Sequence, residues 1–203
     1  VGNTKIGKGG LLEKEADVVS ECIDTVCKAA RTMQDNKVGA LIVFERSTQL
    51  GEIINTGTII DAKASTSVIN NIFFPNSPLH DGAVIIRDGR IYAAGCILPL
   101  TQNNNAFSSN LGTRHRAAIG MTENSDAVVL VVSEETGNIS IVCDGQITRN
   151  YNSVTACAEL RRQLLVDENQ KDSRIVTAIK HLNTFSGGKT KNNTEEMNGN
   201  GKN

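Results

Sequence analysis

The sequence has 203 residues, of which 39% are hydrophobic and 21% charged, so it can bury one sizeable core and leave polar tails. Its formal net charge of −1 excludes the broad basic field that nucleic-acid-binding domains usually carry, and we expect no nucleic-acid partner. No apolar run approaches the roughly 18 residues of a membrane helix, and the five cysteines lack the paired spacing of zinc or redox sites.

The first part of the chain predicts a loose end, a helix and a buried strand. Residues 1–12 are rich in Gly and Lys, and we expect them to be flexible. From Glu13 to about Asn36, apolar residues recur at the spacing of an amphipathic helix: Val19, Cys22, Val26, Ala30 and Met33. Residues 38–44 form a short, continuous apolar run, which is typical of a strand buried on both faces.

Two Asp-Gly pairs predict hairpins. Asp88-Gly89 and Asp144-Gly145 each separate β-rich runs, and the type I′ turn that joins such strands needs positive φ at both central residues. The predicted strands are 83–86 with 90–97, and 139–143 with 146–148.

The remaining pattern completes an α/β fold. Further helices are predicted over residues 66–74, 113–121 and 153–165, the first of them capped by Ser65. A polar loop is expected over residues 101–110 and an apolar strand over residues 127–132. Beyond Lys180 the sequence is too polar to bury itself, which predicts disorder. Hairpins that alternate with helices indicate a single domain with a central mixed β-sheet flanked by helices.

The first segment that suggests chemistry is His80-Asp81-Gly82. Unlike the two hairpin turns, it follows an irregular, proline-containing loop and stands directly before a predicted strand. A carboxylate beside a histidine at the mouth of a strand is well placed to hold a ligand. An aspartate that merely caps a turn would explain Asp81 equally well if the motif stood alone.

The second segment is Gly112-Thr113-Arg114-His115-Arg116, at the start of a predicted helix. Backbone N–H groups at a helix start, reinforced by two guanidinium groups, are suited to hold phosphate. A solvated basic turn is the alternative interpretation.

The third segment, Ser133-Glu134-Glu135, follows the apolar strand 127–132, where carboxylates can bind a divalent metal or its waters. A plain polar turn explains it nearly as well. Together the three segments supply the groups that metal-assisted phosphoryl or nucleotidyl transfer needs. The sequence contains neither a Walker loop nor a G-x-G-x-x-G motif, which excludes an ordinary P-loop or dinucleotide fold.

These segments resemble the diadenylate cyclase family in three blocks: Asn76–Val84, Leu111–Gly120 and Val131–Gly137. The resemblance extends over about residues 38–165 and is greatest to the catalytic domain of the membrane-anchored class. It implies the diadenylate cyclase fold. It also implies that two ATP molecules condense into cyclic di-AMP, a bacterial second messenger, and two pyrophosphates, as each ribose 3′-hydroxyl attacks the other ATP's α-phosphate.

The resemblance also implies roles for individual residues. The catalytic set is Asp81, Arg114 and His115. The substrate-binding set is Gly82, Ala83, Leu98, Gly112, Thr113, Arg114, His115, Arg116, Ser133 and Glu134. A divalent metal, Mn²⁺ or Mg²⁺ with Co²⁺ as a further option, is assigned to His80, Asp81 and Glu135. Gly82 and Ala83 are expected to let the nucleotide approach the backbone closely.

One position departs from the family pattern. Many members have an aromatic residue before the leucine that matches Leu98, whereas this chain has Ile97. An aliphatic side chain can pack on adenine, but it gives up stacking worth roughly 1–3 kcal/mol per base in other nucleic-acid sites. The substitution bears on base affinity and leaves the chemistry intact.

The expected product has two identical halves, so we expect two protomers to meet face to face in an isologous homodimer that catalysis needs. We expect a flexible segment (1–12), a leading helix (13–37), a catalytic domain (38–165) and a carboxy-terminal extension (166–203). The chain opens at Val1. We therefore expect a piece of a longer protein, a cytoplasmic domain at the inner face of the bacterial membrane that contacts it only through upstream segments.

Two other functions stay open at this stage. The first is a catalytically silent module that senses ATP or cyclic di-AMP and acts through partners. The second is an interaction domain whose basic cluster contacts an acidic partner.

Overall fold

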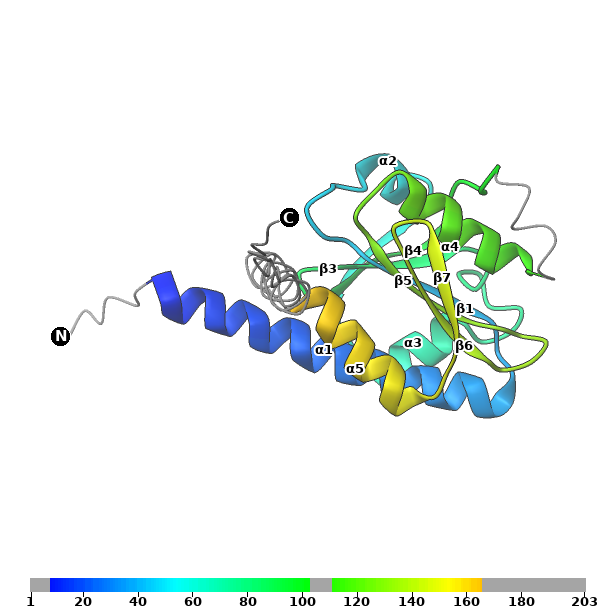
Figure 1. The fold of residues 1–203 in the computed structure, drawn as a ribbon, viewed down its shortest axis with the longest axis horizontal. Helices are drawn as coiled ribbons and strands as arrows, with labels where there is room; N and C mark the ends of the chain where they lie inside the picture. The colour runs from blue at the N-terminus through cyan, green and yellow to red at the C-terminus, as the bar shows by residue number, and fades with distance from the viewer. Residues whose placement is uncertain (1–7, 103–110, 166–203) are drawn as a thin grey trace, which may run out of the picture. The chain divides into compact units, whose positions relative to one another are not determined.

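The computed structural model describes residues 8–102 and 111–165, with side chains from Lys14 onward (Figure 1). The chain divides into a unit of Val1–Leu165 and a second unit of Val166–Asn203. The second unit lies outside the described residues, as does the tail expected to be disordered beyond Lys180. Most of the predicted loop 101–110 lies outside them too.

The described unit is built on one seven-stranded sheet, in the order β2-β4-β3-β1-β5-β6-β7. The strands are β1 (Ala40–Phe44), β2 (Thr58–Lys63), β3 (Ala83–Arg87), β4 (Arg90–Cys96), β5 (Val128–Val132), β6 (Ile139–Cys143) and β7 (Gln146–Tyr151). β1 and β3 pair in parallel, and every other neighbouring pair is antiparallel. The predicted mixed sheet is therefore confirmed.

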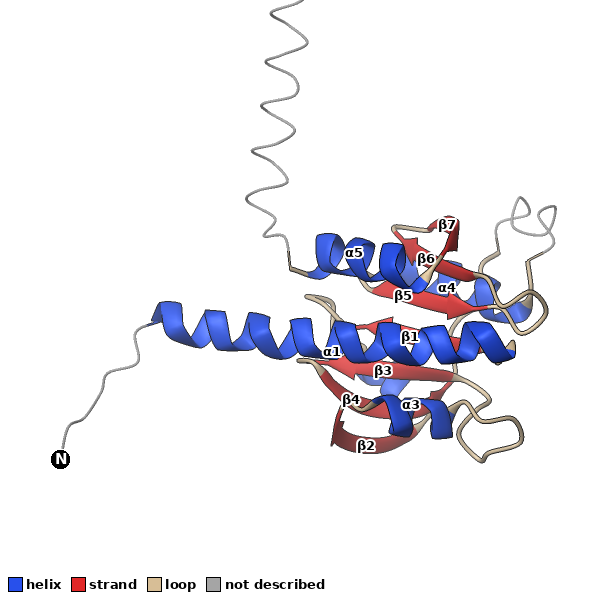
Figure 2. Cartoon of the chain, turned by 90° about the horizontal axis from the view of Figure 1, so that it is seen from below, coloured by secondary structure: helices blue, strands red, loops and turns tan. Residues whose placement is uncertain are grey.

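Helices cover both faces of this sheet. One face carries α1 (Lys8–Asn36), α3 (Thr66–Ile72) and α5 (Ser153–Leu164), with α1 between the other two and running roughly along β1 and β3 (Figure 2). The opposite face carries α2 (Gly51–Ile54) and α4 (Thr113–Glu123) (Figure 1). Because side chains alternate along a strand, β1 contributes to both cores. Ala40, Ile42 and Phe44 pack toward α1, and Leu41 and Val43 pack toward α4.

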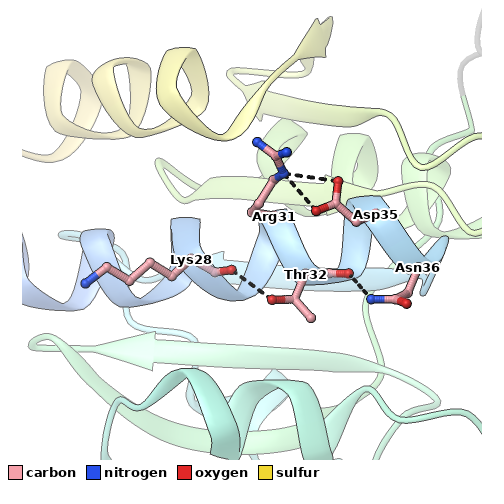
Figure 3. A network of polar contacts seen from close by, with 5 residues as sticks. All are labelled: Lys28, Arg31, Thr32, Asp35 and Asn36. Carbon is pink, nitrogen blue, oxygen red and sulfur yellow. Dashed lines mark hydrogen bonds and ion pairs between the residues drawn. The ribbon is translucent and has the colours of Figure 1, made fainter.

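The carboxy-terminal turns of α1 are held by local polar contacts (Figure 3). Arg31 forms an i,i+4 ion pair with Asp35, and Asn36 donates to the carbonyl of Thr32. The helix begins at Lys8 rather than at Glu13. The residues from Leu11 onward favour helix, and Gly9 and Gly10 each cost the helix only about 1 kcal/mol relative to alanine. Among the helices that the structure describes, none combines the length and apolarity needed to cross a bilayer.

The predicted turns and caps are confirmed. Asp88-Gly89 and Asp144-Gly145 have φ of 50° and 69° in both hairpins, as type I′ turns require. Ser65 accepts a hydrogen bond from the backbone of α3. The sequence missed α2, which is a single turn, and β2, an edge strand. β2 escapes the pattern because its register shifts where Asp61 adopts positive φ, and only Ile60 and Ala62 are partly buried.

A candidate nucleotide site at one end of the sheet

The topology brings several chain segments to one end of the sheet. β1 and β3 are parallel, so both begin there, and their antiparallel neighbours β5 and β4 end there. The register places Ala40 beside Val132 and Ala83 beside Cys96. The first turn of α4 lies at the same end as the turn between β5 and β6 (Figure 1). Loops that follow or precede these strands therefore converge.

A pocket of about 1050 Å³ opens at this end. Its polar lining includes most of the residues that the sequence singled out: His80, Asp81, Gly82, Gly112, Thr113, Arg114, His115, Ser133, Glu134 and Glu135. Its apolar lining includes Leu41, Ile97, Leu98, Leu100 and Leu111. Segments that are far apart in the chain thus face one space.

His80 is oriented by the loop that precedes β3. Its Nδ1 lies 2.6 Å from the carbonyl oxygen of Ser77, and Ser77 Oγ in turn donates to the carbonyl of Ile72. A carbonyl can only accept, so Nδ1 carries the proton, which leaves the lone pair of a neutral ring on Nε2. Nε2 is the atom that can bind a cation, and the exposed carboxylate of Asp81 is the next side chain along.

Gly82 has a structural reason of its own to be glycine. Its φ is +133°, and a methyl group there would lie 2.6 Å from the backbone of Gly95 on β4. The family resemblance implies that Gly82 lets the nucleotide approach the backbone closely. Strand packing and backbone conformation already make any larger residue at this position costly.

Arg114 is the first cation of α4, and it is held against the end of β5. It forms an ion pair with Glu134, and its side chain is 25% exposed. A methyl group at Gly39 would lie 2.5 Å from Nη1 of Arg114 and 2.9 Å from Oε2 of Glu134. Gly39 therefore leaves the space that this ion pair occupies, a role that the sequence analysis missed.

His115 turns toward β6. Its Nε2 lies 3.5 Å from Oγ of Ser140, which is 1% exposed. Burial lowers the pKa of His115 from its usual value of 6.5, and the positive charge of Arg149 lowers it further. His115 is thus neutral at pH 7, so it offers the pocket a hydrogen-bonding ring rather than a third positive charge.

Two residues of the predicted binding set do not line the pocket, namely Arg116 and Ala83. Successive residues on a helix differ in direction by about 100°, and in the first turn of α4 the pocket is lined by Thr113, Arg114 and His115 but not by Arg116. Ala83 is fully buried, and its side chain packs in the core beneath α4 because side chains alternate along β3.

The segment after β5 forms a tight turn that fixes its own polar groups. Gly137 donates to the carbonyl of Ser133, and Thr136 donates to Ser133 Oγ. Glu134 is 63% exposed although it pairs with Arg114, and Glu135 is exposed as well. The turn therefore presents two carboxylates at the rim of the pocket.

The predicted metal ligands do not form a ready-made cage. Among residues 14–102 and 111–165, no three His, Cys, Asp or Glu side chains converge on one point, so Glu135 does not join His80 and Asp81. Mg²⁺ is usually bound by one or two protein groups together with substrate phosphates and waters. The pair formed by His80 Nε2 and the Asp81 carboxylate fits a cation shared with a nucleotide.

The pocket also contains residues that the sequence analysis did not single out, chiefly Ser140, Arg149 and Asn150. The predicted strand ended at Thr148, whereas β7 continues to Tyr151. In the sequence, Arg149 and Asn150 do not stand out as pocket residues, because a polar residue near the end of an edge strand usually faces solvent.

His115 should make the fold less stable at low pH. Its pKa is lower in the folded chain than in the unfolded chain, so below pH 6.5 the unfolded chain binds the proton first. The free energy of unfolding should therefore fall as the pH drops below that value. Urea unfolding at about pH 7.5 and about pH 5.5 measures the loss, and a His115→Gln variant should lose less. Equal losses in the two proteins would contradict this.

Known proteins that are similar to this chain point to one family. The family model described as DisA bacterial checkpoint controller nucleotide-binding matches residues 27–147. The cyclic di-AMP synthase CdaA of Bacillus subtilis is 38% identical over 174 residues, which cover 84% of this chain and 62% of that protein. The cyclic di-AMP synthase CdaS of the same organism is 48% identical over 120 residues, or 59% of this chain and 57% of CdaS. The chain thus spans about three-fifths of the length of these curated relatives.

Solved structures agree with these matches. The crystal structure of a double mutant of DacA from Staphylococcus aureus aligns with a TM-score of 0.68 and 43% identity, and covers 70% of this chain and 95% of that one. A protein from Bacillus cereus described as a hypothetical membrane-spanning protein aligns with a TM-score of 0.60 and 44% identity, over 63% of this chain and 62% of that one. By sequence and by fold, the chain belongs to the diadenylate cyclase family.

Proposed function

We propose that the chain is a catalytic domain that condenses two ATP molecules into cyclic di-AMP and two pyrophosphates. The observation that carries this proposal is the convergence of His80-Asp81, the first turn of α4 and the turn after β5 on one pocket. The curated relatives named as cyclic di-AMP synthases add support.

In this mechanism the pocket holds one nucleotide. Leu98 and the 68%-exposed Ile97 pack against the base, while the N–H groups at the start of α4 and the Arg114 guanidinium bind the phosphates. Asp81 accepts a hydrogen bond from the attacking ribose 3′-hydroxyl and takes up its proton as a general base. The hydroxyl oxygen attacks the α-phosphate of the other ATP, and pyrophosphate leaves.

A divalent cation held by His80 Nε2, Asp81 and phosphate oxygens would offset the negative charge that develops on the α-phosphate. Glu134 acts on Arg114 rather than on the cation. It holds Arg114 in place before the nucleotide arrives, and it can release the guanidinium when phosphate competes for it.

The two-fold symmetry of the product requires a second protomer. One pocket holds one ATP, and each ATP both attacks and is attacked, so two pockets must meet face to face. The rate per protomer should therefore rise with protein concentration until all the chains are paired. Initial rates measured over a dilution series provide the check, and a constant specific rate would contradict the dimer.

The decisive experiment incubates the purified chain with ATP and identifies the product by mass. We expect cyclic di-AMP and pyrophosphate in the presence of Mn²⁺, Mg²⁺ or Co²⁺. ATP binding without product under all three metals would favour a silent sensor module. Absence of any ATP-induced thermal shift would favour an interaction domain.

For the whole protein we propose a membrane-anchored arrangement, with this domain on the cytoplasmic side where ATP is available. The Bacillus cereus protein described as membrane-spanning supports this placement. Fractionation of cells that express the whole protein would test it, since the cyclase activity should sediment with the membranes.

A further inference from the structure

The edge strand β7 carries a bulge at the pocket. Ile139 pairs with Tyr151 and Ile141 pairs with Thr148, so the single residue Ser140 on β6 faces two residues on β7, namely Arg149 and Asn150. Asn150 has φ of +66°, which marks the site of the extra residue. Bulges of this kind bend a strand and redirect its side chains, and they often lie beside active sites.

The bulge changes which side chains face the pocket. In a regular strand, neighbouring residues point to opposite faces of the sheet, so only one of the two could line a given space. Here Arg149 and Asn150 both line the pocket. β7 also contacts α4, and the charge of Arg149 acts on His115, which places this charge near the first turn of α4.

The electrostatics of the pocket show why such a charge matters. A triphosphate brings several negative charges, and Arg116 does not line the pocket. Among the described lining residues, the arginines are Arg114 and Arg149. A guanidinium forms bidentate hydrogen bonds with phosphate oxygens, and an asparagine amide can donate beside it.

We propose that the bulge in β7 builds a polyphosphate subsite, in which Arg149 and Asn150 bind the β- and γ-phosphates of the nucleotide. This inference rests on the proposed function, because it assumes a nucleoside triphosphate in the pocket. The subsite distinguishes ATP from AMP and from cyclic di-AMP, which lack these phosphates. It also holds the pyrophosphate leaving group until the new bond has formed.

The test measures the binding of three probes by titration calorimetry in the presence of Mg²⁺: pyrophosphate, AMP and 3′-deoxyATP, which lacks the attacking hydroxyl. Arg149→Gln should weaken the binding of 3′-deoxyATP and of pyrophosphate by about tenfold or more, and should change the affinity for AMP by less than about twofold. The affinities of Arg149→Lys should lie between those of the unaltered chain and of Arg149→Gln, since lysine keeps the positive charge but cannot form bidentate hydrogen bonds. Unchanged affinity for 3′-deoxyATP, or an equal loss for AMP, would overturn the subsite.

A second pair of variants tests the bulge itself. Asn150→Gly tolerates positive φ and should lose only the contribution of the Asn150 amide, so its affinity for 3′-deoxyATP should fall less than that of Arg149→Gln. Asn150→Val disfavours that conformation and should lose at least as much affinity as Arg149→Gln does. Full affinity in Asn150→Val would overturn the role of the bulge. Arg31→Gln removes an arginine from an exposed ion pair on α1 and should leave all three affinities unchanged.

These measurements separate the subsite from the proposed reaction. If the chain binds 3′-deoxyATP through Arg149 but makes no cyclic di-AMP, the subsite stands and the synthase function fails. If it makes cyclic di-AMP and Arg149→Gln leaves the KM for ATP unchanged, the function stands and the subsite fails. Failure of the unaltered chain to bind pyrophosphate or 3′-deoxyATP would overturn both.

Discussion

Asp81→Asn should slow cyclic di-AMP synthesis by about 10² to 10⁴-fold, because the amide can neither take up the hydroxyl proton nor bind a cation as a carboxylate does. The affinity for 3′-deoxyATP should change much less, since Arg114 and the backbone of α4 remain in place. Initial rates and calorimetry on the same preparation measure the two quantities.

A matched control for this variant lies a few residues along the chain. Asp88→Asn alters an aspartate that also precedes a glycine, but Asp88 occupies a hairpin turn outside the nucleotide pocket. Asn-Gly is as well suited to a type I′ turn as Asp-Gly, so its rate and stability should match those of the unaltered chain. An Asp81→Asn variant as active as Asp88→Asn would remove Asp81 from the reaction.

Gly82→Ala should lower the free energy of unfolding by about 2–5 kcal/mol. Two costs add at this position. The backbone has φ of +133°, which an L side chain rarely adopts, and the new methyl group would meet the backbone of Gly95 at 2.6 Å. Because the opposing atoms belong to β4, rearranging a side chain cannot relieve the contact. Urea denaturation measures the loss.

Gly51→Ala serves as the control for this stability measurement. Nothing lies within 4 Å of a methyl group built at Gly51, and its φ is ordinary. Gly51 is the first residue of α2, where alanine is at least as favourable as glycine. We expect a change within about 0.5 kcal/mol. A Gly82→Ala variant as stable as Gly51→Ala would show that β3 and β4 can separate without cost.

Much of the candidate site was accessible from local sequence. His80-Asp81, Thr113-Arg114 and Ser133 stand at the boundaries of predicted strands and helices, and polar residues at such boundaries are exposed to ligands. The prediction failed for Arg116, because a cluster of basic residues in the sequence does not reveal which of its side chains will face the pocket. Only the tertiary structure shows that Thr113, Arg114 and His115 line the pocket and Arg116 does not.

Other features depend on contacts between distant segments. Gly39 must be small because Arg114 and Glu134 meet above it. The reason for glycine at position 82 is the approach of β4. Arg149 faces the pocket because one extra residue in β7 shifts the register opposite Ser140. None of these partners is a neighbour in sequence, so no local pattern could indicate them.

The sequence by itself determined most of the elements and their chemistry: the buried strands, the type I′ hairpins, the cap at Ser65 and three polar segments suited to a nucleotide. These follow from side-chain periodicity, from φ preferences and from hydrogen bonds within a few residues. The tertiary structure alone decided which of these polar groups share a pocket and which charged side chains line it. Strand order and register set those distances, and they arise from packing across the whole sheet.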